Sequence, residues 1–310
     1  MKRRTIFSMP SLYRDEFRVT GYQFGTTKKD ACIVGAIRGN EIQQLYICSQ
    51  LVKRLKELEA AGKITAGKGI MVIPCVNPFS VNVSKRFWST DNTDINRMFP
   101  GYNLGETTQR IAGGVFEAIQ DYSYGIQFAS FYMSGDFQPH VRVMKTGMEN
   151  IKMAQDFGLH YTVIREPRPY DTTTLNYNWQ LWETNAFSLY TADTERIDEE
   201  TAELGIKSVL NFLAKRKLIS LEDCDKFEPC KGTVINEDSL LTMNTNAAGI
   251  FRIIKGTPGA TVKQGDLLAE ILHPYEGKII KKITAPKDGT VFFVHDRPMI
   301  LAHTVAFKIL

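Results

Sequence analysis

The fold class is decided by residues 31–60, ACIVGAIRGNEIQQLYICSQLVKRLKELEA. An apolar run at 31–37 predicts a buried strand, and the helical spacing of apolar residues from Glu41 to Ala60 predicts a helix. A short turn joins them, and its Asn40 is the expected N-cap of the helix. A buried strand followed directly by an amphipathic helix is the repeating unit of parallel α/β layers.

The same alternation continues on both sides of this stretch. Further strands are expected at 17–24, 70–76, 125–133, 140–145, 161–164 and 187–191. Further helices are expected at about 104–122, 148–157, 174–185 and 198–215. Strands that alternate with helices predict an α/β fold, in which helices flank a mixed sheet.

The pattern changes near residue 230. From there to Leu310 short strands are broken by Gly and Pro, as in TPGATVKQGDLL at 257–268, and no helical period continues. The chain is therefore expected to contain an α/β domain at 1–230 and a small all-β, barrel-like domain at 231–310. The second domain resembles a biotinyl/lipoyl-type hammerhead, but its lysines lack the Met-Lys-Met-like setting of an attachment site, so no covalent cofactor is expected.

Length and composition limit the class of protein. The chain has 310 residues, more than one hydrophobic core usually holds. The formal net charge is +4, and the one basic cluster, Lys2-Arg3-Arg4, is interpreted as a solvated terminus, so neither a nucleic acid nor a membrane is expected as a partner. No apolar run reaches the ~18 residues of a membrane span, and no signal peptide is expected. The five cysteines form no CxxC pair, which favours free thiols and a cytoplasmic location.

Three segments carry a family resemblance: GAIRGNE (35–41), NPFSVNVSKRFWSTDNTDINRMFPG (77–101) and QPHVRVM (138–144). Together with the β tail, they resemble the succinylglutamate desuccinylase/aspartoacylase family of zinc carboxypeptidase-like hydrolases. The resemblance extends from about Phe17 to Leu310, and 77–101 is its most specific part. It implies a zinc-carboxypeptidase-like mixed sheet and the hydrolytic deacylation of N-acyl amino acids.

The resemblance also implies a zinc site, and this sequence departs from it. The family holds zinc with a His and a Glu of an H-G-N-E-like turn and with a second His at the end of a later strand. Here Arg38 takes the first His position, Glu41 is the one retained ligand, and Phe131 is the residue expected at the second His position. Ala192 stands where the family has its general-base Glu, with Asp193 close by.

One carboxylate holds zinc poorly, because the affinity comes from several ligands in a fixed geometry. A guanidinium stays protonated near neutral pH and repels a divalent cation beside it. Zinc is therefore expected to be absent or weakly bound. Our hypothesis is that Arg38 replaces the charge of the metal and pairs with Glu41, which would otherwise be an uncompensated carboxylate.

The substrate-binding half of the motif is retained. Arg86, Asn96 and Arg97 match the family positions that bind a substrate carboxylate, and Arg86 would also polarise a scissile carbonyl. The bland alternative is that both arginines lie on the surface. His140 is the best remaining candidate for a catalytic imidazole and Asp193 for a catalytic carboxylate, although a lone His on a strand is more often structural.

Three functions follow from these residues. The first is a family member with lost or altered zinc catalysis, a pseudoenzyme that still binds a small carboxylate-bearing molecule similar to an N-acyl amino acid. The second is an active deacylase, which requires either metal ligands that the motifs do not reveal or a metal-free mechanism that uses Glu41, His140 or Asp193. The third is a non-catalytic interaction protein whose pocket is vestigial, which a cleft plugged by Phe131 and Trp88 would support and an open, arginine-lined cleft would oppose. Homo-oligomerisation is left open by the sequence.

Overall fold

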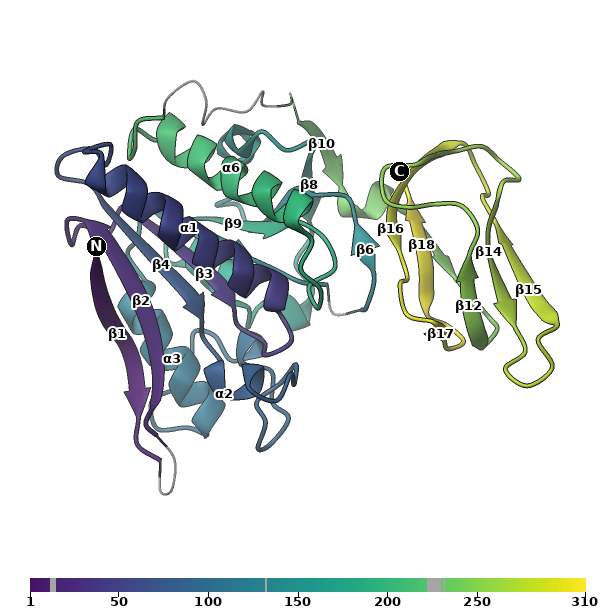
Figure 1. Cartoon of the computed structure of the whole chain (residues 1–310), viewed down its shortest axis with the longest axis horizontal. Coiled ribbons are helices and arrows are strands. Elements are labelled where there is room, and N and C mark those ends of the chain that lie inside the picture. Colours follow the sequence, from purple (N-terminus) through teal and green to yellow (C-terminus); the bar gives the residue numbers. More distant parts are fainter. Residues whose placement is uncertain (12–14, 132, 222–229, 231) are drawn as a thin grey trace. The chain divides into compact units, whose positions relative to one another are not determined.

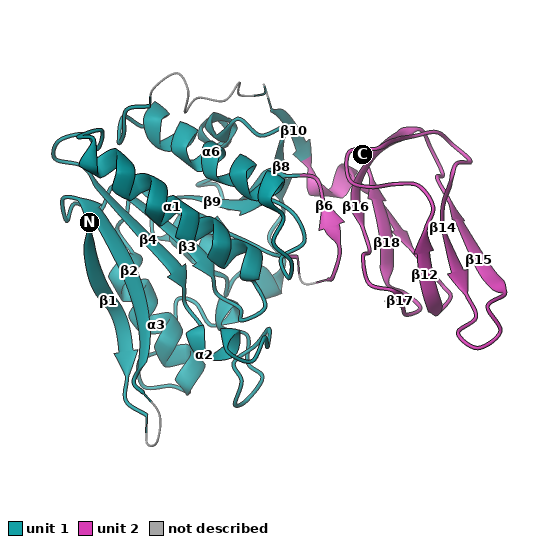
Figure 2. Ribbon diagram, viewed as in Figure 1, with its two compact units in different colours: residues 1–130, 139–235 teal, residues 131–138, 236–310 magenta. Residues whose placement is uncertain are grey.

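The structure is a computed structural model that describes residues 1–11, 15–131, 133–221, 230 and 232–310. It confirms the α/β prediction, with one large mixed sheet and several small antiparallel strands towards the C-terminus (Figure 1). The chain forms two compact units, one of residues 1–130 and 139–235 and one of residues 131–138 and 236–310 (Figure 2). Residues 131–138, which the sequence analysis gave to the first domain, thus lie with the second.

The first unit contains a nine-stranded sheet in the order β1-β2-β4-β3-β5-β9-β7-β8-β10. Its strands are β1 (Lys2–Met9), β2 (Phe17–Gly25), β3 (Ala31–Ala36), β4 (Gly69–Cys75), β5 (Tyr124–Phe128), β7 (His140–Met144), β8 (Tyr161–Arg165), β9 (Asn185–Tyr190) and β10 (Thr233–Asn236). The central strands β4, β3, β5 and β9 are mutually parallel, whereas β7 runs antiparallel to β9.

Helices cover both faces of this sheet. The main ones are α1 (Ile42–Ala60), α3 (Thr107–Ile119), α5 (Leu175–Leu181) and α6 (Glu199–Lys215), with short turns at α2 (Pro78–Val81), η1 (Ile95–Arg97), α4 (Ile151–Ala154), η2 (Gln155–Phe157) and η3 (Pro169–Asp171). Alternate residues of β3 enter different cores, since Ile33 packs with α1 and α6 whereas Val34 packs with α3 and α5. Gly125 of β5 lets α5 approach closely, because a Cβ there would lie 2.6 Å from the Trp179 ring.

The topology gathers several loops at one edge of the sheet. Because β4, β3, β5 and β9 are parallel, their carboxyl ends meet at the same edge. Strand β7 begins there, since its first residue, His140, pairs with Tyr190 at the end of β9. Open α/β sheets bind ligands at such an edge, and the turns after β3 and β5 carry Glu41 and Ser130 to it.

The N-terminus differs from the expectation of a solvated end. Residues Lys2–Met9 form the edge strand β1, which pairs antiparallel with β2. Lys2, Arg3 and Arg4 are exposed, as expected, and charged side chains on an edge strand oppose pairing with other chains. The run of basic residues gave no apolar alternation from which to predict this strand. Ile6 and Phe7 hold it in place by packing on the core below α3.

The second unit consists of short antiparallel strands and contains no α-helix among its described residues. One sheet holds β11 (Leu241–Asn244), β18 (Val305–Ile309), β16 (Gly289–Val294), β13 (Thr261–Val262) and β6 (Asp136–Phe137). The other holds β15 (Ile279–Thr284), β14 (Leu267–Leu272), β12 (Gly249–Ile253) and β17 (Met299–Ile300). Across the described part of the chain, no helix combines the length and the apolar character that crossing a membrane requires.

Candidate functional site

Glu41 is held rigidly by the turn between β3 and α1. Its Oε2 accepts hydrogen bonds from the backbone N–H groups of Ile37 and Arg38, both at 3.0 Å, and the residue is only 1% exposed. Glu41 itself occupies the N-cap position of α1, so the prediction of Asn40 as the cap was wrong. The Asn40 amide instead donates to Oε1 of Glu195 at 2.9 Å.

Gly39 makes this turn possible. Its N–H donates to the carbonyl oxygen of Arg86 at 3.2 Å, which joins the turn to the loop after β4. A Cβ at this position would lie 2.3 Å from both the Lys85 carbonyl oxygen and the Ser80 carbonyl carbon. Glycine is therefore required here, because any side chain would separate the two loops.

Arg38 lies between two carboxylates. Its Nη1 donates to Oε1 of Glu41 at 3.1 Å, which confirms the predicted pairing. On the other side, Nε donates to both oxygens of Asp94 at 3.1 Å and Nη2 donates to Oδ2 at 2.9 Å. Burial opposes the charge of this residue, but the carboxylates of Asp94 and Glu41 outweigh that effect and raise the pKa of Arg38 above its ordinary value. The guanidinium is thus a fixed buried cation.

Ser130 completes this cluster. It lies just after β5, its hydroxyl donates to Oε1 of Glu41, and it accepts from Nη1 of Arg38 at 3.2 Å. The side chain that reaches Glu41 from β5 therefore belongs to Ser130. The ring of Phe131 packs against Phe137 and Phe293, with centroids 4.8 and 5.6 Å away. The sequence analysis missed Ser130, although its place after the strand was the available signal.

Arg86 is half-buried close to this cluster. Its guanidinium carbon lies 5.8 Å from the centroid of the Phe87 ring. Burial, and then the positive charge of Arg38, lower the pKa of Arg86, while nearby carboxylates act in the opposite direction. The free energy of this cation is therefore unfavourable, and a bound anion would lower it. Trp88, two residues further on, is buried against Phe17 in the core.

Asn96 and Arg97 are directed towards η3 and α5. Asp94 caps η1, because its Oδ1 accepts from the Asn96 N–H at 3.0 Å. The Asn96 side chain accepts in turn from the backbone N–H of Leu175 at 3.3 Å. Arg97 donates to the carbonyl oxygen of Tyr170, and its Nη1 lies 3.6 Å from Oδ1 of Asp171.

The two weaker catalytic candidates also have structural contacts. His140 is buried, and its ring stacks on that of Tyr190 with centroids 4.7 Å apart. Asp193 accepts from the Glu195 N–H at 3.1 Å and pairs with Nε of Arg196 at 2.9 Å. These contacts are typical of a packed strand residue and of a loop carboxylate.

The donors around Glu41 do not fit a zinc ion. Zinc sites in proteins use several His, Cys, Asp or Glu ligands, and no group of three or more such residues in the described part of the chain could hold a metal. Both oxygens of Glu41 already accept hydrogen bonds, and the neighbouring charge is a guanidinium. The groups around Glu41 therefore suit an ion pair with a guanidinium and not a bound zinc ion.

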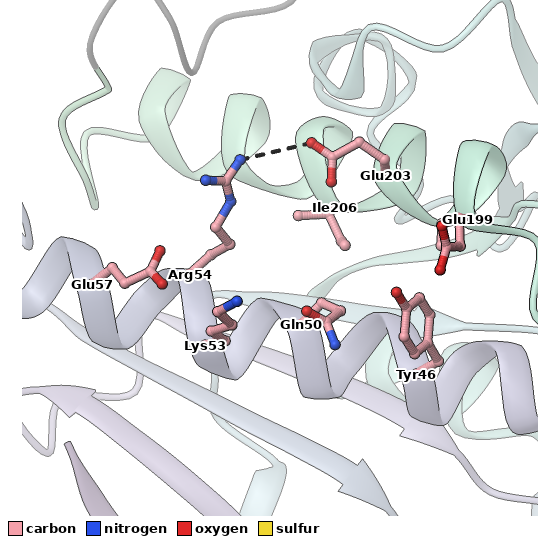
Figure 3. Close-up of a pocket in the computed structure, with 9 residues that line it drawn as sticks. Tyr46, Gln50, Lys53, Arg54, Glu57, Glu199, Glu203 and Ile206 are labelled. Carbon is pink, nitrogen blue, oxygen red and sulfur yellow. Dashed lines mark ion pairs between the residues drawn. The ribbon is translucent and has the colours of Figure 1, made fainter.

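A separate hollow lies between α1 and α6 (Figure 3). It is lined by the side chains of Tyr46, Gln50, Lys53, Arg54, Glu57, Glu199, Ala202, Glu203 and Ile206. The figure shows Arg54 reaching across to Glu203, a contact of 3.7 Å between two well-exposed side chains. Exposed ion pairs of this kind contribute little to stability, so a substitution of Arg54 should leave the fold intact.

A family model matches residues 27–216, and it describes the succinylglutamate desuccinylase/aspartoacylase catalytic domain. The chain belongs to this family. It is thus related to a family of hydrolases that are typically zinc-dependent. No curated protein sequence matches the chain.

Solved structures give the same fold. A succinylglutamate desuccinylase from Silicibacter sp. TM1040 is 18% identical with a TM-score of 0.83, covering 99% of this chain and 94% of that one. A succinylglutamate desuccinylase/aspartoacylase from Rhodobacter sphaeroides is 16% identical with a TM-score of 0.79, covering 99% and 94%. The product-bound ectoine utilization protein EutE from Ruegeria pomeroyi is 17% identical with a TM-score of 0.77, covering 97% and 92%. At these identities the likeness establishes the architecture.

Proposed function

We propose that this family member binds a small carboxylate-bearing molecule, similar to an N-acyl amino acid, without zinc-dependent turnover. One observation carries the proposal: the guanidinium of Arg38 is buried between Glu41 and Asp94, with hydrogen bonds to both carboxylates. The positive charge beside Glu41, the one residue that matches a metal ligand of the family, is thus supplied by the Arg38 side chain.

Charge balance supports the loss of zinc. A divalent ion on Glu41 would have to displace the Arg38 guanidinium from this carboxylate and would then lie beside a buried cation, which is costly inside a protein. Ser130 approaches Glu41 from the end of β5, and we propose that it, rather than Phe131, occupies the second His position of the family. A neutral hydroxyl in place of an imidazole is a poor zinc ligand.

Loss of the general base supports altered catalysis. The loop after β9 has Ala192 at the position where the family resemblance puts the base, and an alanine cannot accept a proton. The adjacent Asp193 is engaged with Arg196 and with the backbone of Glu195. An active hydrolase would therefore require a different proton acceptor.

Ligand binding is supported by the arginines near this edge. An anion beside Arg86 would offset both the burial and the repulsion from Arg38 that lower its pKa. Arg97 can also turn to a ligand, because its partner Asp171 would keep a second arginine, Arg165, at 2.9 Å. A planar guanidinium binds a carboxylate through two parallel hydrogen bonds. We also propose a cytoplasmic location, because the five cysteines form no CxxC pair and are consistent with free thiols.

The test combines metal analysis with ligand binding on the purified chain. We expect substoichiometric zinc, no hydrolysis of acetyl- or succinyl-amino acids, and an increase in melting temperature with N-acetyl amino acids. Arg86→Gln should weaken that binding by roughly ten- to a hundredfold, the usual effect of losing a charged hydrogen-bond partner. Arg54→Gln is the matched control and should bind normally. Stoichiometric zinc with turnover would establish an active deacylase and refute the proposal.

A further inference from the structure

The nine-stranded sheet has an open edge at β1 (Figure 1). Strand β1 pairs with β2 on one side, and in the described part of the chain no strand lies on its other side. An edge of this kind presents unpaired backbone N–H and C=O groups, which another extended segment can bind. Because β1 lies three strands away from β3, this edge is distinct from the loops that carry Glu41 and Ser130.

Three consecutive cations lie on the first half of this edge strand. Lys2, Arg3 and Arg4 are exposed, and none of them pairs with a carboxylate among the described residues. Their cross-strand neighbours on β2, residues 21–23, carry no charge. Like charges that face each other across strands are unfavourable, whereas opposite charges are favourable. A second copy of this chain would add three more cations, so the charge selects an acidic segment as the partner.

A β-bulge limits the length of edge that an added strand can use. The register of β1 on β2 shifts between Thr5 and Phe7. Ile6 lies over β2, where a Cβ on Gly21 would be 2.8 Å from its Cδ1. Bulges disrupt pairing along an edge strand. An added strand is therefore expected to pair with residues 2–5, beside the three cations.

A hollow of about 650 Å³ lies next to this segment, between β1 and α3. Thr5 and Ser8 line it on the β1 side. The two elements meet at Gly114 of α3, where a Cβ would lie 2.2 Å from the Phe7 ring. Successive side chains of a strand point to opposite faces of the sheet. A strand added to β1 would therefore direct every second side chain towards the face where this hollow lies.

Arg110 adds a fourth cation to the wall of the hollow. It lies on the same face of α3 as Gly114 and Glu117, since residues four and seven positions apart on a helix share a face. Arg110 is exposed and has no ion pair among the described residues. Glu117 lines the hollow about two turns further along the helix. The end of the hollow near Arg110 therefore suits an acidic side chain.

We propose that β1 and the hollow beside it bind an extended acidic segment of a partner protein. The segment adds a strand to residues 2–5 through backbone hydrogen bonds, and its carboxylates neutralise the cations of this edge. One of its side chains enters the hollow between β1 and α3. This interaction is independent of the proposed ligand binding, because it uses no residue at the carboxyl edge of the sheet.

The test measures the binding of short peptides to the full chain by fluorescence anisotropy. The probe is a blocked peptide in which glutamate alternates with valine, and we expect it to bind more tightly at low salt than at high salt. The matching peptide with lysine in place of glutamate should not bind. Two further acidic peptides carry N-methyl groups on alternate residues. The one that loses the N–H groups facing β1 should bind at least roughly tenfold more weakly, although every carboxylate remains.

Two double variants locate the site. Arg3→Gln with Arg4→Gln should weaken binding of the acidic peptide by roughly three- to thirtyfold, as expected for the loss of two exposed ion pairs. Lys281→Gln with Lys282→Gln is the matched control, because it removes two consecutive exposed cations from β15, an edge strand of the other unit. This control should bind the peptide normally.

Three results would overturn the inference. The first is the absence of binding by the acidic peptide. The second is an equal loss of binding in the two double variants. The third is undiminished binding of both N-methylated peptides, or equally tight binding of a single-stranded oligonucleotide of the same charge, because either would show attraction between charges without the addition of a strand.

Discussion

Arg38 and Arg142 lie in the same unit of the molecule, but their guanidinium groups have opposite surroundings. Arg38 is 4% exposed and donates to Glu41, Asp94 and Ser130. Arg142 is half-buried, its guanidinium carbon lies 4.4 Å from the centroid of the Tyr190 ring, and its buried Nε has no hydrogen-bond partner among the described residues. The comparison separates two surroundings of an arginine. The charge of Arg38 is neutralised by carboxylates of the chain itself, whereas no carboxylate is paired with Arg142 among the described residues.

The largest expected effect comes from replacing the Arg38 guanidinium beside Glu41 with metal ligands. Arg38→His together with Ser130→His would place two imidazoles beside Glu41, the usual ligand number of a catalytic zinc site. We expect this double variant to bind zinc with a micromolar or tighter Kd, about 8 kcal/mol of binding free energy, whereas the wild-type chain does not. Calorimetry and metal analysis after dialysis measure this.

A second double variant tests the position of the ligand. Arg38→His with Phe131→His should not gain zinc, because Ser130 is the residue whose side chain reaches Glu41. If this pair bound zinc and the Ser130 pair did not, Phe131 would be the true second position and Ser130 would be a neighbour.

The next effect concerns stability. Arg38→Met leaves Glu41 and Asp94 buried without their cation and should lower the free energy of unfolding by about 3–5 kcal/mol. Arg142→Met removes no ion pair and should cost only about 1 kcal/mol, the contribution of its contact with Tyr190. Urea denaturation of both variants measures the difference. Equal losses in the two variants would remove the distinction between the arginines.

The smallest effect concerns the thiol of Cys75 on β4. Burial raises the pKa of Cys75 to about 12, so the folded state favours the neutral thiol. The stabilisation is complete below the ordinary thiol pKa of 9.0 and is lost as the pH rises towards 12. Between pH 9 and 11 the wild-type free energy of unfolding should therefore fall more steeply than that of Cys75→Ala, by at most about 1.4 kcal/mol per pH unit. Parallel slopes would show that this thiol is accessible to ionisation in the folded state.

The sequence by itself determined the architecture and the pairing of Arg38 with Glu41. Apolar runs alternating with amphipathic helices predicted the mixed sheet, because burying one face of each element leaves few arrangements. The identity of Arg38 beside Glu41 predicted their ion pair, because the two lie three residues apart in one turn. The sequence did not predict the edge strand Lys2–Met9, because its basic residues are typical of a solvated end.

The partners that come from distant parts of the chain were decided by the tertiary structure alone. Asp94 reaches Arg38 from a loop 56 residues away, and Ser130 reaches Glu41 from 89 residues away. Local patterns specify which face of an element is buried, but the pairing of buried polar groups depends on strand order and register, which set the distances between them.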